Sequence, residues 1–186
     1  MAKQAVLPLE NGGMVDYSRF TNQDFLKSYG KLLDGLLKKA ERGFDDLLKI
    51  PLREANFGSV VEVFLNKDDD LEQFYVFLEH LNAVESLDSL RGIVERFKPK
   101  LVAYGNKVNF SGAFYKLLKQ VSVGNLTPLQ QRSVALLRRD MEFEGVHLPV
   151  AKKKQLELIN HRLSELGEKF ANQALDSRKK FFYQFK

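Results

Sequence analysis

Apolar residues recur at steps of three and four positions along most of the chain, which places them on one face of an α-helix. The first run begins at Thr21, whose hydroxyl can cap free amides at a helix start while Asp24 completes a capping box. Pro51 ends this run. Its apolar positions are Phe25, Tyr29, Leu32, Leu33, Leu36, Leu37, Ala40, Phe44, Leu47 and Leu48.

A second run starts at Asn56 and keeps its phase across the acidic residues 68–70, so we predict one long helix that ends near Ser86. Carboxylates are ligands for hard cations, and this acidic run is a candidate cation site. Consecutive helical positions point about 100° apart, however, so three adjacent carboxylates do not converge. The run is better interpreted as a solvated helix face.

A third helix is predicted from Ser86 or Asp88, with Pro99 interrupting or kinking it, and a short helix follows Asn109. The next helix is bounded by clear signals. Thr127 is a cap, Pro128 stands at the first helical position, where its missing amide hydrogen has no cost, and Gly145 is suited to a left-handed stop.

The longest amphipathic run begins around Pro149 and predicts the last helix. Its apolar seam has the 3-4-3-4 spacing of a coiled coil, which requires a partner helix. The loop 146–148 is short, so we predict that the preceding helix is this partner, packed antiparallel. The seam consists of Leu156, Ile159, Leu163, Leu166 and Phe170.

These patterns predict an all-α fold, an antiparallel bundle of about six to seven helices with a long C-terminal helix. Residues 1–20 form an extended lead-in, and residues 21–186 form a single helical domain. The only possible strand is 181–185. The same C-terminal end crowds four aromatic residues, which suggests a chain cut inside a larger structure or an end that docks on a partner. They are Phe181, Phe182, Tyr183 and Phe185.

Composition narrows the possible classes of protein. The chain has 186 residues, is 44% hydrophobic and contains no cysteine, which excludes disulfides, thiolate nucleophiles and cysteine zinc sites. We find no signal-peptide pattern and no apolar run that could cross a membrane, so we expect a cytoplasmic protein.

Charge is distributed unevenly. Residues 1–88 carry 10 Lys and Arg against 16 Asp and Glu, whereas residues 89–186 carry 19 against 8. The basic half could bind an acidic partner or nucleic acid, attract the acidic half, or face acidic surface missing from this chain. Because basic residues cluster only at 152–154 and 178–180, nucleic-acid binding is the less favoured interpretation.

No catalytic, cofactor-binding or metal-binding residue can be assigned from the sequence. The histidines lack the HExxH spacing of a zinc helix, and neither a G-x-S-x-G elbow nor a glycine-rich phosphate loop is present. We interpret His80 as a partly buried packing residue and His161 as a surface residue. His147 follows Gly145 and is suited to bond helix-end carbonyls.

Several segments together resemble the thimet oligopeptidase and oligopeptidase A family of zinc metallopeptidases. The segment 138–149 reads RRDMEFEGVHLP, and Leu163-Ser164-Glu165-Leu166, Lys169-Phe170 and Leu175-Asp176 follow at the family's spacing. Ala55-Asn56-Phe57 and residues 80–84 are similar to its second long helix. One departure is Gln173, where the family usually has asparagine; Asn172 is displaced by one position.

The resemblance implies an all-helical N-terminal region that forms one wall of a deep channel over the active site. In the family a later HExxH region binds zinc, the metal activates water, and short peptides are cleaved. None of those roles falls on a residue of this chain, so zinc is expected only in the full-length enzyme.

Two hypotheses follow from the sequence. The first is the N-terminal domain of such an oligopeptidase, inactive alone, whose partner is the catalytic remainder in cis or trans and whose full enzyme acts on short peptides. The second is a stand-alone helical module whose basic half binds an acidic protein or nucleic acid. An enzyme with unrecognised acid–base chemistry is the least favoured alternative, because no titratable cluster is evident.

Overall fold

The computed structural model describes residues 23–67, 69–85 and 88–180, and over these residues the fold is all-α, as predicted. The predicted lead-in, the cap at Thr21 and the C-terminal residues 181–186, with the possible strand and the four aromatics, lie outside the described part. In order, the elements are α1 (Gln23–Leu47), η2 (Leu52–Glu54), η3 (Phe57–Glu62), α2 (Val63–Asn66), α3 (Asp69–Glu85), α4 (Asp88–Asn109), α5 (Gly112–Gln120), α6 (Pro128–Phe143) and α7 (Val150–Lys180).

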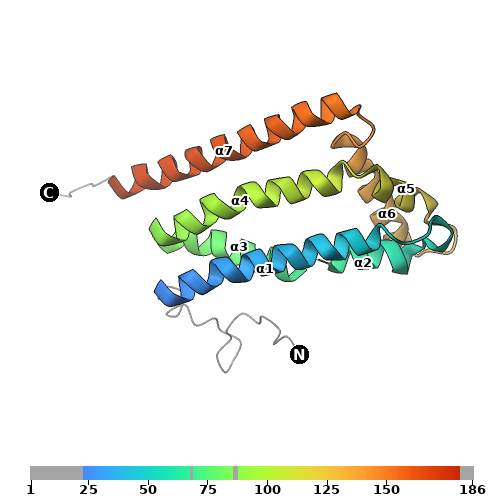
Figure 1. Ribbon diagram of the computed structural model, residues 1–186, viewed down its shortest axis with the longest axis horizontal. Helices are drawn as coiled ribbons and strands as arrows, with labels where there is room; N and C mark the ends of the chain where they lie inside the picture. Colours follow the sequence, from blue (N-terminus) through green and yellow to red (C-terminus); the bar gives the residue numbers. More distant parts are fainter. Residues whose placement is uncertain (1–22, 68, 86–87, 181–186) are drawn as a thin grey trace, which may run out of the picture.

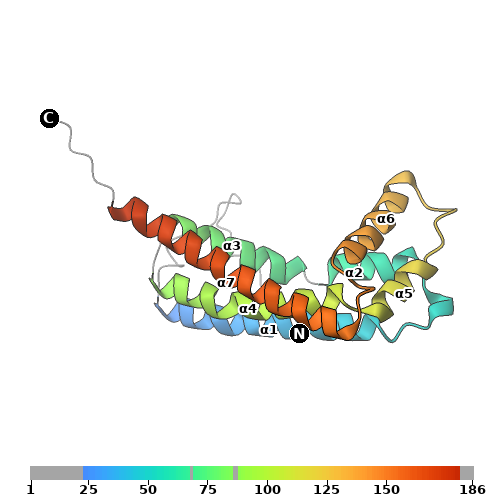
Figure 2. The same cartoon turned by 90° about the horizontal axis from the view of Figure 1, so that it is seen from above.

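Three long helices, α1, α3 and α4, pack on one another, while α2, α5 and α6 gather at one end of them (Figure 1). The chain leaves that end through the loop after α6 and returns as α7. This last helix runs antiparallel to α4 and lies along its outer side, as the second view also shows (Figure 2).

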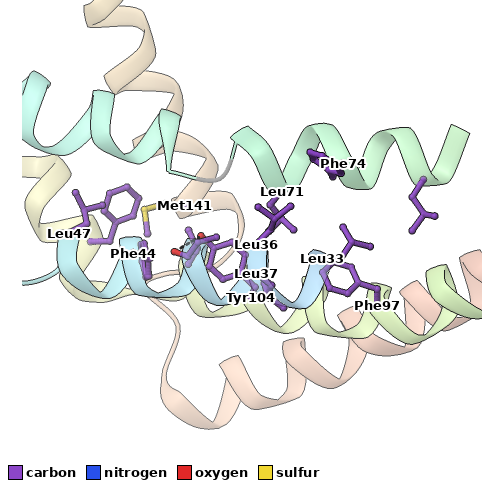
Figure 3. Packing of buried hydrophobic residues seen from close by; sticks show 14 of the residues in the cluster. Leu33, Leu36, Leu37, Phe44, Leu47, Leu71, Phe74, Phe97, Tyr104 and Met141 are labelled. Carbon is purple, nitrogen blue, oxygen red and sulfur yellow. Dashed lines mark hydrogen bonds between the residues drawn. The ribbon is translucent and has the colours of Figure 1, made fainter. Parts of the chain in front are cut away.

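The core lies between α1, α3 and α4 and continues into the end formed by α5 and α6 (Figure 3). Leu33 of α1 is fully buried, and the buried Tyr29 hydroxyl donates a hydrogen bond of 2.8 Å to the carbonyl of Phe74. At the other end Phe114 packs edge-on against Phe44, with ring centroids 5.6 Å apart. The buried face of α1 confirms seven of the predicted positions, while Leu32 and Leu48 are only partly buried and Leu26 is buried without having been predicted. This face comprises Leu26, Tyr29, Leu33, Leu36, Leu37, Ala40, Phe44 and Leu47.

The predicted single helix from Asn56 to Ser86 is wrong, because α2 ends at Asn66 and α3 begins at Asp69. The start is as predicted, since Asn56 forms a capping box with Ser59, although the first turn is π-helical. Asp69 and Asp70 of the acidic run stand in the first turn of α3, where carboxylates interact favourably with free amides and the helix dipole. These two carboxylates therefore start a helix and do not lie in the middle of one.

Other predicted boundaries are confirmed. Thr127 forms a capping box with Gln130 at the start of α6, and Gly145 adopts a φ of 91° after its end. Pro99, by contrast, lies inside α4, which continues on both sides of it, so the predicted interruption of the helix there is wrong.

The predicted partner of the last helix is wrong. The turn at Gly145 and the loop to Pro149 direct α7 onto α4, and α6 instead packs on α5 and η3. In Figure 3 α7 passes beneath α4, and none of the labelled core residues comes from it. Among the described residues, no buried apolar side chain belongs to α7.

Candidate interaction surface on the last helix

The face of α7 that lies on α4 is polar. Its partners follow an antiparallel order, so residue numbers fall along α7 as they rise along α4. Glu168 accepts from Lys98 at 2.7 Å, and the side-chain amides of Asn160 and Asn106 are joined at 2.8 Å. Further polar contacts are Arg91 to Asp176 at 2.9 Å, Asn172 to Glu95 at 2.8 Å, and the Lys153 ammonium to the Phe110 carbonyl at 2.9 Å.

Two of these contacts are ion pairs, Glu168 with Lys98 and Asp176 with Arg91, and both are partly shielded from water. The Glu168 side chain is only 13% exposed, and Lys98 also lies 3.8 Å from Glu79. The hydrogen bond that Arg91 donates to the Asp176 carboxylate is the main cause that raises the pKa of Arg91 above its ordinary value. Partly buried charges need partners of this kind, because an unpaired charge out of water is costly. The α4–α7 contact is therefore specific, but it buries few apolar groups.

A cleft of about 300 Å³ lies between α4 and α7, beside Pro99. His161 and Ser164 of α7 line it together with Lys98 and Glu168. His161 is half-buried here, so it stands at the surface as the lining of a cleft and not on the solvent-facing side of the helix. This position follows from the orientation of α7, which turns its polar face, and not its apolar one, toward the rest of the domain.

The apolar face of α7 points to solvent. We call Ile159, Leu163, Leu166 and Phe170 the outer stripe. Their exposed fractions are 53%, 62%, 46% and 74% in that order. Only Leu156, at the start of the predicted seam, is half-buried; its Cδ2 approaches the turn at Gly145. The seam has the predicted spacing, but within the described residues the outer stripe has no helix packed on it.

The other candidate residues do not converge. His80 and His147 are both exposed, so the packing role expected for His80 is wrong. At the end of α6 the backbone itself bonds the carbonyls, since the Val146 amide donates to Met141 at 2.9 Å. Lys153 faces α4, whereas its neighbours Lys152 and Lys154 are exposed, so this basic cluster is divided between two faces.

Part of the charge asymmetry is satisfied inside the domain. Lys100 pairs with Asp34 at 2.5 Å, and Lys107 pairs with Asp45 at 2.6 Å. Both pairs join the basic half of the chain to the acidic half. These contacts favour the interpretation that the halves attract each other.

The described residues do not fit a metal centre. In residues 23–67, 69–85 and 88–180 no three His, Asp or Glu side chains are grouped so that they could hold an ion. Within the same ranges no helix is long and apolar enough to cross a bilayer.

Comparison with known proteins identifies the family. The family model for the N-terminal domain of neurolysin and thimet oligopeptidase matches residues 33–153, well over half of the chain. Oligopeptidase A of Escherichia coli is 32% identical over 114 residues, which are 59% of this chain and 17% of that protein. A probable cytosolic oligopeptidase A of Arabidopsis thaliana is 26% identical over 150 residues, 78% of this chain and 21% of its own length.

The chain therefore belongs to the neurolysin and thimet oligopeptidase family and contains its N-terminal domain. It spans about a fifth of the length of the curated relatives that it matches. The matched domain ends at residue 153, whereas α7 continues to Lys180. Most of α7, including the whole outer stripe, thus lies beyond the matched domain.

Proposed function

We propose that this chain is the N-terminal helical part of a zinc-dependent oligopeptidase and that it forms one wall of the channel through which short peptides reach the active site. The observation that supports the proposal best is the family match over residues 33–153. In this proposal the chain is not catalytic by itself, and residues 21–186 act as one domain. The catalytic remainder, in cis or in trans, binds the zinc.

The fold is consistent with a wall. The long helices α1, α3 and α4 form an elongated layer, and α7 lies along the outer side of α4 (Figure 1). The cytoplasm is the proposed compartment, supported by the lack of cysteine and by the Arabidopsis relative described as a probable cytosolic oligopeptidase A. The competing proposal, a basic interaction module, has less support, because Lys98, Lys100 and Lys107 are engaged by acidic residues of the same chain.

Two measurements test this function. The purified chain is expected to show no hydrolysis of a quenched fluorescent peptide; turnover that a zinc chelator abolishes would contradict its non-catalytic role. A chimera of E. coli oligopeptidase A, in which residues 33–180 of this chain replace the corresponding segment, is expected to hydrolyse the peptide. A folded but inactive chimera would contradict the proposal, and salt-dependent retention of the isolated chain on nucleic acid would favour the alternative.

A further inference from the structure

The two faces of α7 have opposite characters. The outer stripe advances by steps of four, three and four residues, so its side chains fall within a sector of about 60° around the helix axis. Asn160, Glu168 and Asn172 lie on the other side of the helix and bind α4. The polar face of α7 thus packs on the chain's own domain, while an apolar row roughly 17 Å long is left exposed.

An exposed row of large apolar side chains on one helix face is typical of a protein–protein contact. Scattered single residues need no explanation, but these four are consecutive members of one helical period. Leu158 provides the contrast on the same helix. It is 72% exposed and stands about 100° away from Ile159, outside the stripe.

The position of the stripe in the chain indicates what covers it. The match to the N-terminal domain ends at residue 153, and the outer stripe begins at Ile159. About four-fifths of the length of the curated relatives lies outside this chain, since the match covers 17% and 21% of the two described above. In the proposed oligopeptidase, the part that follows the N-terminal domain would offer a large surface next to α7.

Charge beside the stripe favours this occupant over a second copy of the chain. Arg162 and Lys169 are two helical turns apart on the same edge of the stripe, and both are exposed. Glu165 pairs with Arg162 at 2.9 Å, whereas within the described ranges Lys169 forms no ion pair. Two copies paired antiparallel through the stripe would bring these basic edges together, which is unfavourable. A partner helix with acidic residues beside its apolar face would be favoured.

We propose that the outer stripe of α7 is the docking surface for an apolar helix, flanked by acidic residues, in the part of the oligopeptidase that lies outside this chain. This inference rests on the proposed function and names the contact that joins the two parts. In this arrangement α7 contacts both parts of the enzyme. Hydrogen bonds and ion pairs hold it on α4, and apolar packing joins it to the rest of the enzyme.

The test compares the isolated chain with the chimera described above. The stripe variant is Leu163→Asp with Phe170→Asp, and the matched control is Val150→Asp with Leu158→Asp, which changes two equally exposed residues of α7 outside the stripe. In the isolated chain both variants are expected to keep the wild-type melting temperature. In the chimera the stripe variant is expected to lower the melting temperature and to reduce peptide hydrolysis about tenfold or more, because charges would replace apolar contacts. The control should stay within about twofold.

The outcomes separate the two proposals. An inactive, folded parent chimera contradicts the proposed function itself. An active parent chimera in which the stripe variant behaves like the control overturns the docking surface and leaves the function standing. Sedimentation of the isolated chain is expected to show a monomer; a dimer that the stripe variant dissociates would assign the stripe to a second copy.

A charge reversal tests the acidic flank. Lys169→Glu in the chimera is expected to reduce activity or thermal stability, and the loss should shrink at high salt because screening weakens like-charge repulsion. An increase in either quantity would contradict an acidic partner and indicate a basic one.

Discussion

Arg91 of α4 and Asp176 of α7 form a two-pronged ion pair, with Nη2 2.9 Å from Oδ1 and Nη1 3.4 Å from Oδ2. Arg91 is largely covered, whereas Asp176 is half exposed. The pair fixes the far end of α7, where few apolar contacts hold the helix. Planar pairing of guanidinium and carboxylate gives direction as well as attraction. This pair therefore has a larger effect on the orientation of α7 on α4 than on the stability of the core.

Asp176→Asn removes one charge of this pair and keeps the shape of the side chain. We expect the amides of α7 beyond Glu168 to exchange hydrogen severalfold faster, because the helix end opens locally. The amides of α1 and α3 should be unaffected, since they belong to the core. Hydrogen exchange followed by mass spectrometry measures both. Equal acceleration in α1 would show that the pair supports the whole fold.

The fold could be predicted largely from the sequence, whereas the direction of α7 could not. The buried face of α1, the cap at Thr127 and the stop at Gly145 follow from local rules that hold in any tertiary setting. Along α7, however, polar residues recur with helical spacing just as apolar ones do. Lys153, Asn160, Glu168, Asn172 and Asp176 are separated by 7, 8, 4 and 4 positions.

Hydrophobic periodicity identifies a face that will be covered, but it does not say by what. The prediction assigned the seam to the preceding helix because the loop between them is short. In the structure the contacts with Lys98 and Arg91 place α7 on α4 instead. No pattern in the sequence marks these two residues as partners of α7. The regular spacing of polar residues along α7 was the one pattern that could have indicated them.

A pair of leucine substitutions tests the division between core and outer stripe. Leu33→Ala removes a fully buried side chain, and we expect the free energy of unfolding to fall by about 2–5 kcal/mol. Leu163→Ala removes an exposed one and should change it by about 0.5 kcal/mol or less in the isolated chain. Urea denaturation measures both. A large loss for Leu163→Ala would mean that α7 packs on its own domain through the stripe.

The buried Tyr29 predicts alkaline destabilisation. Burial raises the pKa of its hydroxyl above the ordinary value, because the charged form is disfavoured away from water. Unfolded tyrosine ionises near pH 10, so above that pH the folded state holds more protons than the unfolded state. The free energy of unfolding should therefore fall as pH rises beyond about 10.

Tyr29→Phe tests the cause of that fall. At neutral pH the substitution removes the hydrogen bond to the Phe74 carbonyl and should cost about 1 kcal/mol. Above pH 10 the difference from the wild type should shrink, because phenylalanine does not ionise. Tyr75, whose pKa burial also raises, leaves part of the alkaline fall in place. Urea unfolding at pH 8, 10 and 11 makes the comparison; parallel losses in both proteins would exclude Tyr29 as a source.

Gly145→Ala tests the turn that sends α7 to α4. Gly145 has a φ of 91°, and a Cβ added there would lie 2.5 Å from Cδ1 of Leu148. A left-handed conformation costs a residue with a side chain about 1–2 kcal/mol, so we expect a loss of at least that size in urea denaturation. Gly35→Ala is the matched control, because Gly35 lies within α1 and its added Cβ meets nothing within 4 Å. Alanine is the better helix former by about 1 kcal/mol, so this control should stabilise the protein. The same exchange thus has opposite signs at the two sites, and a neutral Gly145→Ala would show that the turn does not constrain the path into α7.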